Sequence, residues 1–299
     1  MSTQTVSLFL NPVAGRGRAR KRLPEIEHAF RAAGIDVDLH LSRAVGDLET
    51  RVTEQVRAGI INIVVAGGDG SVHEAVNGIM NAGATARLGI VPVGTGNDFA
   101  KACAIPLDWE LAVDALVARL ENTQPLRVID VGRMNGRYFA NGVGIGFDAK
   151  VTQLARSYRW PIGDMVYLLA IFRCMLDGIA TPELKIVAGD LSWKGPATLA
   201  AITNGPWVGG MFHIAPMAAN DDGFLDLLIA DPVSRLRICA LLPKLMRGEH
   251  VDQAEITHAT VTSLSLDASA PVPSHLDGEV QALTTRFEIE LLPKALEII

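Results

Sequence analysis

The sequence predicts an α/β domain built on a parallel sheet, followed by a second domain that is rich in β-strands. In the first third of the chain, short apolar runs alternate with helical repeats, and strand-like runs separated by turn residues dominate the remainder. The chain has 299 residues, of which 49% are hydrophobic and 20% are charged, a composition typical of a folded protein with a sizeable core. We expect the domains to cover residues 1–127 and 128–289.

Strands and helices alternate in the first predicted domain. Runs of apolar residues predict the strands, and the runs at 60–66 and 88–93 are continuous enough to be buried on both faces. The predicted strands cover residues 6–10, 35–41, 60–66 and 88–93, and the predicted helices cover 23–33, 48–57 and 72–80. This order favours a parallel sheet that is covered by helices on both faces.

Strands are the commoner prediction in the second domain. Turn signals such as Asn135-Gly136 and Asp222-Gly223 separate several of them. The predicted strands cover residues 126–133, 138–143, 184–188, 197–203, 225–230, 260–266 and 286–291. Apolar spacing predicts a helix at 162–176, and a basic amphipathic pattern predicts another at 235–247. The pattern as a whole indicates mainly antiparallel strands.

Charge and cysteine usage exclude several classes of protein. The formal net charge of −6 lacks the basic footprint of a nucleic-acid-binding protein, so we expect no nucleic-acid partner. The three cysteines lie far apart and fit neither a disulfide framework nor a zinc site. The sequence does not begin as a signal peptide does, and its longest apolar run is too short to cross a bilayer. We therefore expect a cytoplasmic protein, peripheral at the membrane surface if it meets a membrane at all.

A glycine-rich segment, Gly67-Gly68-Asp69-Gly70-Ser71, connects the buried strand at 60–66 to the helix at 72–80. Glycine allows the backbone to approach a phosphate closely, and the helix directs its free N–H groups and positive dipole end at the same space. Ser71 is suited to cap the helix or to donate to a phosphate oxygen. Asp69 would face phosphate through a cation, and Mg²⁺ prefers such carboxylate and phosphate oxygens. Taken alone, the segment fits a tight strand-to-helix turn equally well.

Two further segments follow strands of the same sheet. Gly94-Thr95-Gly96-Asn97-Asp98 comes after the strand at 88–93, and Asn11-Pro12 with Gly15 comes after the strand at 6–10. Ligands of parallel sheets bind beyond the carboxyl ends of the strands, so we expect the three segments to converge on one crevice. Their spacing matches neither the Walker A motif nor the dinucleotide-binding fingerprint.

In this order and at these intervals, the three segments resemble the diacylglycerol kinase catalytic domain, and most of all the bacterial lipid kinases of the YegS and DgkB type. The resemblance covers nearly the whole chain, and it continues through Asn141-Gly142-Val143-Gly144-Ile145-Gly146-Phe147-Asp148, Ala215-Pro216, Asp221-Asp222-Gly223-Phe224-Leu225-Asp226 and His275-Leu276-Asp277-Gly278-Glu279. It implies an N-terminal α/β domain related to phosphofructokinase and NAD kinase, and a C-terminal β-rich sandwich domain. It also implies that residues from about 290 to 299 return to the first domain.

The resemblance implies an ATP-dependent lipid kinase, a phosphotransferase that moves the γ-phosphate of ATP to a lipid hydroxyl with the help of Mg²⁺. The family's nucleotide contacts match Asn11, Ser42, Gly67, Gly68, Asp69, Gly70, Ser71, Val72, His73 and Thr95. Ser71 and His73 stand where the family more often has Thr and Asn. Serine keeps the hydroxyl, whereas histidine changes one nucleotide contact.

The resemblance also implies a set of metal and catalytic residues. Asp222, with the backbone carbonyls of Ala219 and Phe224, matches a structural Mg²⁺ site in the second domain. Asp69 matches a residue that helps to hold the catalytic Mg²⁺, directly or through water, and Asp277 matches the proposed base. Phosphoryl transfer needs mainly positioning and neutralisation of charge. Asp277 would therefore accept the hydroxyl proton as transfer proceeds.

Several alternatives stay open at this level. The acceptor lipid could be diacylglycerol, phosphatidylglycerol, a sphingoid base or another long-chain alcohol, since pocket shape decides among them. An NAD kinase-like enzyme shares the segment at 67–70, although the segments at 94–98 and 275–279 favour a lipid kinase. A non-catalytic nucleotide-binding regulator is the other alternative. The helices at 164–176 and 235–247 fit either contact with a membrane surface or packing on their own domain. Nothing in the sequence indicates an oligomeric state.

Overall fold

The structure is a computed structural model that describes residues 5–121, 124–158, 163 and 165–299. The chain divides into two compact units. Unit 1 comprises Met1–Ile129 and Lys294–Ile299, and unit 2 comprises Asp130–Pro293. The chain therefore passes from one unit to the other twice, within strand β5 (Arg127–Met134) and within strand β16 (Thr284–Ile298).

The core of unit 1 is a parallel sheet with the strand order β2-β1-β3-β4. Its strands are β1 (Thr5–Leu10), β2 (Asp36–Leu41), β3 (Asn62–Gly67) and β4 (Arg87–Pro92). Glu297 and Ile298 of β16 pair in parallel with Arg87 and Leu88, so the end of the chain extends this sheet beyond β4. The predicted parallel sheet is confirmed.

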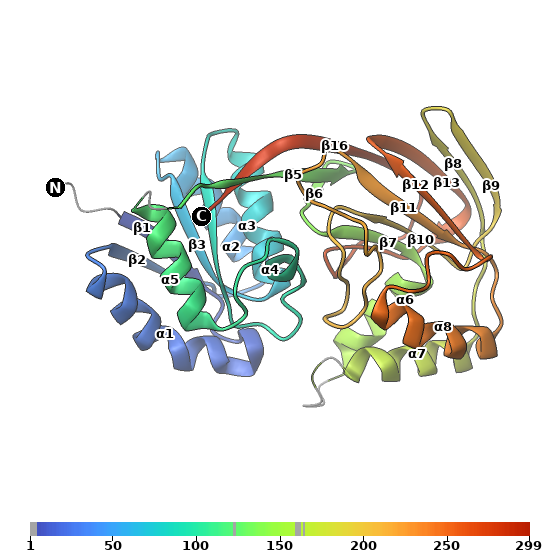
Figure 1. The fold of residues 1–299 in the computed structure, drawn as a ribbon, viewed down its shortest axis with the longest axis horizontal. Coiled ribbons are helices and arrows are strands. Elements are labelled where there is room, and N and C mark those ends of the chain that lie inside the picture. The colour runs from blue at the N-terminus through green and yellow to red at the C-terminus, as the bar shows by residue number, and fades with distance from the viewer. Residues whose placement is uncertain (1–4, 122–123, 159–162, 164) are drawn as a thin grey trace. The chain divides into compact units, whose positions relative to one another are not determined.

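Helices cover both faces of this sheet, with α1 and α5 on one side and α2 and α3 on the other (Figure 1). The helices are α1 (Ala14–Ala32), α2 (Asp47–Arg57), α3 (Asp69–Ala82), the short α4 (Asp98–Ala102) and α5 (Trp109–Leu120). The predicted start of the first helix at residue 23 is wrong, because α1 already begins at Ala14. The basic residues that follow Gly15 therefore belong to a helix and not to a loop.

Unit 2 contains two antiparallel sheets that face each other. One includes part of β16 with β13 (Ser263–Val272), β8 (Glu183–Ala188) and β9 (Leu191–Pro196), and β6 (Arg137–Phe139) pairs with β5. The other has the order β12-β11-β10-β7-β14-β15, formed by β7 (Gly142–Gly146), β10 (Leu199–Thr203), β11 (Leu225–Ala230), β12 (Ile256–Val261), β14 (Ser274–Leu276) and β15 (Glu279–Val280). Phe139, Ile202 and Phe287 belong to the core that both sheets share. The β-rich second domain is confirmed as a sandwich.

Two strands predicted as continuous are interrupted. The predicted strand at 138–143 is in fact two, because β6 ends at Phe139 and β7 begins at Gly142. The backbone N–H groups of Ala140 and Asn141 donate to the carboxylate of Asp277 instead of to a neighbouring strand. The predicted strand at 260–266 is likewise split between β12 and β13.

Three helices pack on the outer face of the second sheet of unit 2. They are α6 (Phe147–Ser157), α7 (Met165–Asp177) and α8 (Arg235–Arg247), and their apolar faces form a common cluster. The helices predicted at 162–176 and 235–247 are confirmed as α7 and α8, except that positions 162 and 164 lie outside the described residues. Among the helices of the described part, none combines the length and apolar character needed to cross a membrane.

Candidate active site

The glycine-rich segment at 67–71 forms the junction between β3 and α3. The prediction that the helix starts after this segment is wrong, because α3 begins at Asp69 and includes Gly70 and Ser71 in its first turn. A Cβ atom at Gly67 would lie 2.5 Å from the Cβ atom of Ser71, so only glycine permits so close a turn. The positive end of the α3 dipole is therefore presented where β3 ends, and the N–H groups of Ser71 and Val72 close the first turn on the carbonyl of Gly68 at 2.9 and 3.1 Å.

The segment at 94–98 lies directly against this junction. A Cβ atom at Gly94 would come within 2.4 Å of the Cα atom of Gly68, so the two backbones touch where both residues are glycine. Asp69 strengthens the contact, since its Oδ1 atom accepts a hydrogen bond from the backbone N–H of Phe99 at 3.1 Å. The carboxylate of Asp69 thus joins the first turn of α3 to that of α4.

The third segment, after β1, meets the same place. Gly15 has a φ of +56°, and a Cβ atom there would lie 2.0 Å from the carbonyl oxygen of Val93. Arg18 donates from Nε to the carbonyl of Gly15 at 3.1 Å and from Nη2 to the carbonyl of Gly94 at 2.8 Å. These contacts confirm that the three segments converge. Arg18 was not predicted as a site residue, although its place one turn after Gly15 was a usable signal.

Three of the predicted nucleotide contacts lie on the loops around this junction. Asn11 forms an Asx turn, in which its Oδ1 atom accepts the N–H of Val13 at 3.1 Å. Ser42 follows β2 and donates its backbone N–H to the carbonyl of Leu10 at 2.9 Å, which holds it beside the end of β1. Thr95 is exposed at the tip of the segment at 94–98.

Two other predicted contacts have buried side chains. Val72 and His73 point into unit 1, and the side chain of His73 lies beside Asn77, with 3.4 Å between Nε2 and the amide nitrogen. Neither side chain is therefore placed to serve a ligand of the junction, and the N–H of Val72 already donates to the carbonyl of Gly68 at 3.1 Å.

A polar pocket opens beside the segment at 94–98. It is lined by Arg18, Arg22, Thr95, Asn97, Asp108 and Trp109, together with apolar neighbours. The guanidinium group of Arg22 lies over the ring of Trp109, 5.6 Å from its centroid, in a cation–π contact. The guanidinium group of Arg18 beside the hydroxyl of Thr95 suits an anionic ligand such as a phosphate group, whereas Arg22 already pairs with Glu25 at 2.8 Å.

In unit 2, Asp277 occupies the turn between β14 and β15. Its backbone has a φ of +49°, and the next residue, Gly278, has a φ of +85°. The carboxylate accepts three backbone N–H groups, from Ala140 at 3.0 Å and from Asn141 and Gly142 at 2.9 Å each. These donors stabilise the ionised form and fix its direction. Asp277 therefore also anchors the start of β7, a role that the sequence did not reveal because the partners lie far away along the chain.

The residues predicted to hold a structural Mg²⁺ lie in the loop at 219–224. Asp130 fixes this loop, because its N–H donates to the carbonyl of Asn220 at 2.7 Å and its Oδ2 accepts the N–H of Gly223 at 2.8 Å. Asp222 is exposed, and its Oδ1 accepts the N–H of Phe224 at 2.9 Å. A carboxylate beside main-chain carbonyls is an all-oxygen donor set, which fits Mg²⁺. Within the described ranges, no group of three or more His, Cys, Asp or Glu side chains is arranged to hold a metal.

A buried acidic residue lies next to this loop. Burial raises the pKa of Asp226, and a hydrogen bond from His258, with 2.7 Å between Nε2 and Oδ1, opposes that rise. The negative charge of Asp222 also raises the pKa of Asp226. A cation bound to the loop would offset this repulsion between carboxylates.

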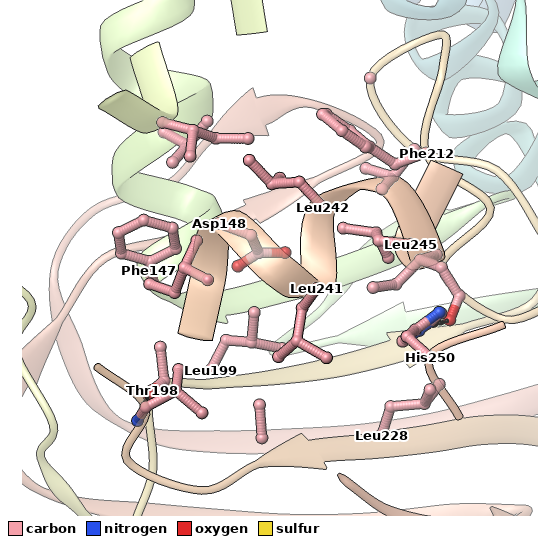
Figure 2. Close-up of a pocket in the computed structure, with 18 of the residues that line it drawn as sticks. Phe147, Asp148, Thr198, Leu199, Phe212, Leu228, Leu241, Leu242, Leu245 and His250 are labelled. Atoms are coloured by element: carbon pink, nitrogen blue, oxygen red, sulfur yellow. Dashed lines mark hydrogen bonds between the residues drawn. The ribbon is translucent and has the colours of Figure 1, made fainter. Parts of the chain in front are cut away.

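Unit 2 also contains an apolar pocket between α6, α7, α8 and the outer face of the second sheet (Figure 2). Its volume is about 130 Å³, and aliphatic and aromatic side chains such as Leu199, Phe212 and Leu242 form most of its wall. Polar side chains are the minority in the lining and comprise Asp148, Thr152, Tyr167, Thr198 and His250. A pocket of this kind accepts hydrocarbon far better than a polar ligand.

The chain matches two family models that together span most of its length. Residues 5–134 match the diacylglycerol kinase catalytic domain, and residues 141–299 match the YegS C-terminal NAD kinase beta sandwich-like domain. A diacylglycerol kinase of Bacillus subtilis (strain 168) is 30% identical over 91% of this chain and 88% of its own. A Pseudomonas fluorescens protein named "Probable lipid kinase YegS-like" is 31% identical over 96% of this chain and 93% of its own.

A solved structure shares the fold over the whole length. It is a crystal structure from Bacillus anthracis described as a candidate diacylglycerol kinase, with a TM-score of 0.81 and 26% sequence identity over 100% of this chain and 98% of that one. The family models and this structure agree with an N-terminal α/β domain followed by a C-terminal β-rich domain. The chain belongs to the diacylglycerol kinase-like lipid kinase family, a family of phosphotransferases with an alcohol group as acceptor.

Proposed function

We propose that this protein transfers the γ-phosphate of ATP to a hydroxyl group of a lipid such as diacylglycerol or phosphatidylglycerol. The observation that carries the proposal is the contact between Gly68 and Gly94, where two backbones meet at the N-terminal end of α3. Backbone N–H groups without side chains in the way form a natural cradle for phosphate groups. The names of the relatives point to the acceptor, and the apolar pocket of unit 2 is suited to the hydrocarbon part of a lipid.

In unit 1, we assign the nucleotide to the converging segments. Asn11, Ser42 and Thr95 would contact it together with residues 67–71, and Arg18 would add positive charge beside the phosphates. Val72 and His73 would support the site from within the first turns of α3 and would not contact the nucleotide with their side chains, which are buried. These roles follow from the position of each residue at the carboxyl end of a parallel strand or in the first turn of the next helix.

Mg²⁺ would be held beside the nucleotide by Asp69, through water, and in unit 2 by Asp222 with the carbonyls of Ala219 and Phe224. Bound next to ATP, the ion neutralises charge that develops on the phosphates during transfer. Asp69 is suited to an indirect role, since its Oδ1 already accepts the N–H of Phe99. The loop at 219–224 is suited to a structural ion, since Asp130 fixes it independently of any metal.

Asp277 would accept the proton of the lipid hydroxyl as phosphate transfer proceeds. Three backbone N–H groups hold and orient its carboxylate, which supports the role of a positioned proton acceptor. A strong base is not needed where the transition state is loose and catalysis rests on positioning.

Incubation of the purified protein with labelled ATP and Mg²⁺ tests the proposed function. The acceptors should be presented separately: diacylglycerol, phosphatidylglycerol, a sphingoid base and NAD. We expect label in at least one lipid and none in NAD. Label in NAD alone would favour an NAD kinase-like enzyme, and ATP binding without any transfer would favour a nucleotide-binding regulator.

We further propose that unit 2 contacts the membrane surface through α7. Met165, Leu169, Phe172 and Leu176 recur at helical spacing and are 52%, 40%, 47% and 72% exposed. Three of the four basic residues of α8 are engaged within the protein, since Arg237 pairs with Glu255, Lys244 with Gln253 and Arg247 with Glu249. Contact through α7 should therefore depend more on apolar burial than on anionic lipid.

Co-sedimentation with vesicles, with and without anionic lipid, tests this contact. Phe172→Ser should lower binding to both kinds of vesicle. Leu283→Ser, at a residue of unit 2 that is 65% exposed and does not belong to α7, should leave binding unchanged. Equal and negligible binding of the unaltered protein to both vesicles would exclude a membrane contact.

A further inference from the structure

The wall of the apolar pocket contains one carboxylate, which has a buried oxygen atom. Asp148 lies in the first turn of α6 and lines the pocket, where Figure 2 shows it among apolar side chains such as Leu241 and Leu242. Its Oδ1 atom is buried and has no hydrogen-bond partner among the described residues. A buried carboxylate oxygen without a donor is costly, so its presence here calls for a physical reason.

The other carboxylate oxygen of Asp148 faces His275 of β14. Its Oδ2 atom lies 3.4 Å from Nε2 of His275, longer than the roughly 2.9 Å of a well-formed N–H···O hydrogen bond. Within the part of the chain that the structure describes, Nε2 of His275 has no hydrogen-bond partner. Its Nδ1 atom accepts the N–H of Gly278 at 3.3 Å, which assigns the proton of a neutral ring to Nε2, the atom that faces Asp148.

Gly144 of β7 provides the space in which the two side chains meet. It pairs directly with His275 in the sheet. A Cβ atom at Gly144 would lie 2.0 Å from Oδ2 of Asp148 and 2.4 Å from Nε2 of His275. Any other residue would therefore place a side chain between them, and the glycine is what permits the pair.

The pair connects the pocket with the turn that carries Asp277. Asp148 lines the pocket, His275 is its neighbour, and the ring of His275 holds the N–H of Gly278. Gly278 follows Asp277 in the same turn, and Asp277 in turn holds the backbone of residues 140–142. A change at Asp148 thus has a short route to Asp277, through the contact with the ring of His275 and the hydrogen bond from the N–H of Gly278.

We propose that Asp148 and His275 are positioning residues that couple the filling of this pocket by an acyl chain to the turn that carries Asp277. This proposal rests on the proposed function and names the pocket as the site of the acceptor's acyl chain. Water in an empty pocket competes with His275 for the carboxylate of Asp148. An acyl chain displaces that water and leaves the Nε2–H of His275 as the donor to Asp148, and a hydrogen bond to a charged group is stronger in a dry, apolar environment.

The coupling predicts that the acyl chain controls turnover as well as affinity, because the binding of a remote part of the substrate orders the reacting part. Diacylglycerols of increasing chain length, presented in mixed micelles, should show a kcat that rises until the pocket is full. Asp148→Asn and His275→Leu should lower kcat for the longest chain by roughly ten-fold, as expected for one hydrogen bond to a charged group. In both variants kcat should no longer depend on chain length, and the KM for ATP should stay unchanged.

Two further variants distinguish a positioning role of His275 from a general disturbance of the structure. His275→Gln keeps an N–H donor on a side chain of similar reach and should restore part of the dependence on chain length. Asp190→Asn, in an exposed turn of the same unit, should behave as the unaltered protein. All variants should unfold cooperatively. Variants of Asp148 and His275 whose kcat still rises with chain length, or an unaltered protein whose kcat is indifferent to it, would overturn the proposal.

A binding measurement keeps the proposal separate from the proposed function. In NMR spectra of the histidine side chains without ATP, saturation with dioctanoylglycerol should slow the exchange of the Nε2–H proton of His275 with water. The same lipid should have no such effect in Asp148→Asn. If the protein phosphorylates no lipid but shows this change, the lipid kinase assignment is refuted, while the proposed coupling between the pocket and His275 still stands. Saturation without any change at His275 would refute the coupling, whatever the activity.

Discussion

Asp277 combines two roles that a single substitution affects together. Asn would replace one carboxylate oxygen by an NH2 group, so at least one of the N–H groups of residues 140–142 would lose its acceptor. We expect Asp277→Asn to lower turnover by about 10²–10⁴-fold, as for loss of a positioned base. The free energy of unfolding should fall by about 1–3 kcal/mol, as for an unsatisfied buried donor.

Steady-state kinetics, ATP titration and denaturant unfolding of this variant measure the two effects separately. Asp190→Asn is the control, since Asp190 is exposed in a turn of the same unit. A loss of stability with normal turnover would leave Asp277 a structural role alone. ATP binding should be nearly unchanged, because the nucleotide is assigned to unit 1.

His250 gives the stability of unit 2 a dependence on pH. It is buried in the pocket wall, burial lowers its pKa from the ordinary value of 6.5, and its Nε2 atom lies 3.0 Å from the carbonyl oxygen of Ile214. As pH falls below 6.5, the unfolded chain takes up a proton that the folded protein does not. The contribution of neutral His250 to the free energy of unfolding is therefore fully present above pH 6.5. It is lost progressively as the pH falls from 6.5 to the lowered pKa of the folded protein.

His250→Gln should flatten the fall of the melting temperature between about pH 7 and pH 5, the range in which histidine titrates. Part of the slope should remain, because burial also lowers the pKa of His213. His28→Gln, at an exposed position of α1, should leave the slope as it is. A slope that is identical in the His250 variant would show that His250 is not kept neutral by burial.

At the scale of single residues, the sequence named acidic groups but not their partners. Asp69 and Asp277 could be predicted as site residues because they stand inside short motifs. Their hydrogen bonds could not, because Phe99 and residues 140–142 become neighbours only when the strands pair. The same holds for His275, whose meeting with Asp148 depends on the register of β14 against β7.

At the scale of elements, the proposed nucleotide site depends on how the segments between strands and helices pack together. The contact of Gly68 with Gly94 allows this dependence to be tested. Gly94→Ala would place a methyl group 2.4 Å from the Cα atom of Gly68 and 2.6 Å from Oδ1 of Asn97. The segments at 67–71 and 94–98 must then separate. We expect the affinity for ATP to fall by at least about ten-fold, equivalent to about 1.4 kcal/mol.

Isothermal titration with ATP measures this effect, and Gly195→Ala provides a matched control. A Cβ atom at Gly195 meets nothing closer than 3.5 Å, so ATP affinity and fold should both be retained. Unchanged ATP affinity in the Gly94 variant would place the nucleotide elsewhere in unit 1.

Element boundaries show where local sequence signals stop. Asp, Gly and Ser are poor helix formers, so propensity placed the start of α3 at residue 72, whereas the geometry of the β3–α3 turn places it at Asp69. The helix α5 was not predicted, although Asp108 is a usable start signal that accepts the N–H groups of Glu110 and Leu111. In β6 and β7, the demands of a distant carboxylate override the strand pattern of residues 138–143.

At the scale of the whole molecule, residues 294–299 return the end of the chain to unit 1, where they pair with β4. Leu296, Ile298 and Ile299 are almost fully buried, and the N–H of Ile299 donates to the carbonyl of Leu88 at 3.0 Å. Removal of these six residues should destabilise unit 1 by several kcal/mol, since each buried aliphatic side chain contributes about 1.5–3 kcal/mol. ATP binding should weaken with it.

Thermal unfolding and ATP titration of the truncated protein measure this loss. Glu297→Gln is the control, because it removes only a half-exposed ion pair with Arg87 and should change stability by less than about 1 kcal/mol. A truncated protein that melts and binds ATP as the full chain does would show that the last strand is dispensable.

Most of the overall architecture could be predicted from the sequence, because periodicity of the apolar residues decides between a parallel sheet with helices and antiparallel strands. From the sequence, we expect domain boundaries near residues 127 and 290. In the structure, the chain leaves unit 1 after Ile129 and returns to it at Lys294. Periodicity alone could not show which strand neighbours β4, since that pairing joins residues 210 positions apart in the case of Arg87 and Glu297.

The pairing of β16 with β4 has a consequence for synthesis of the protein. The ribosome makes the chain from its N-terminus, so β1 to β4 emerge long before the strand that completes their sheet. During that interval the nascent chain carries an open sheet edge at β4, the kind of edge that invites aggregation or a chaperone. Unit 1 is thus the first to be translated and the last to be finished.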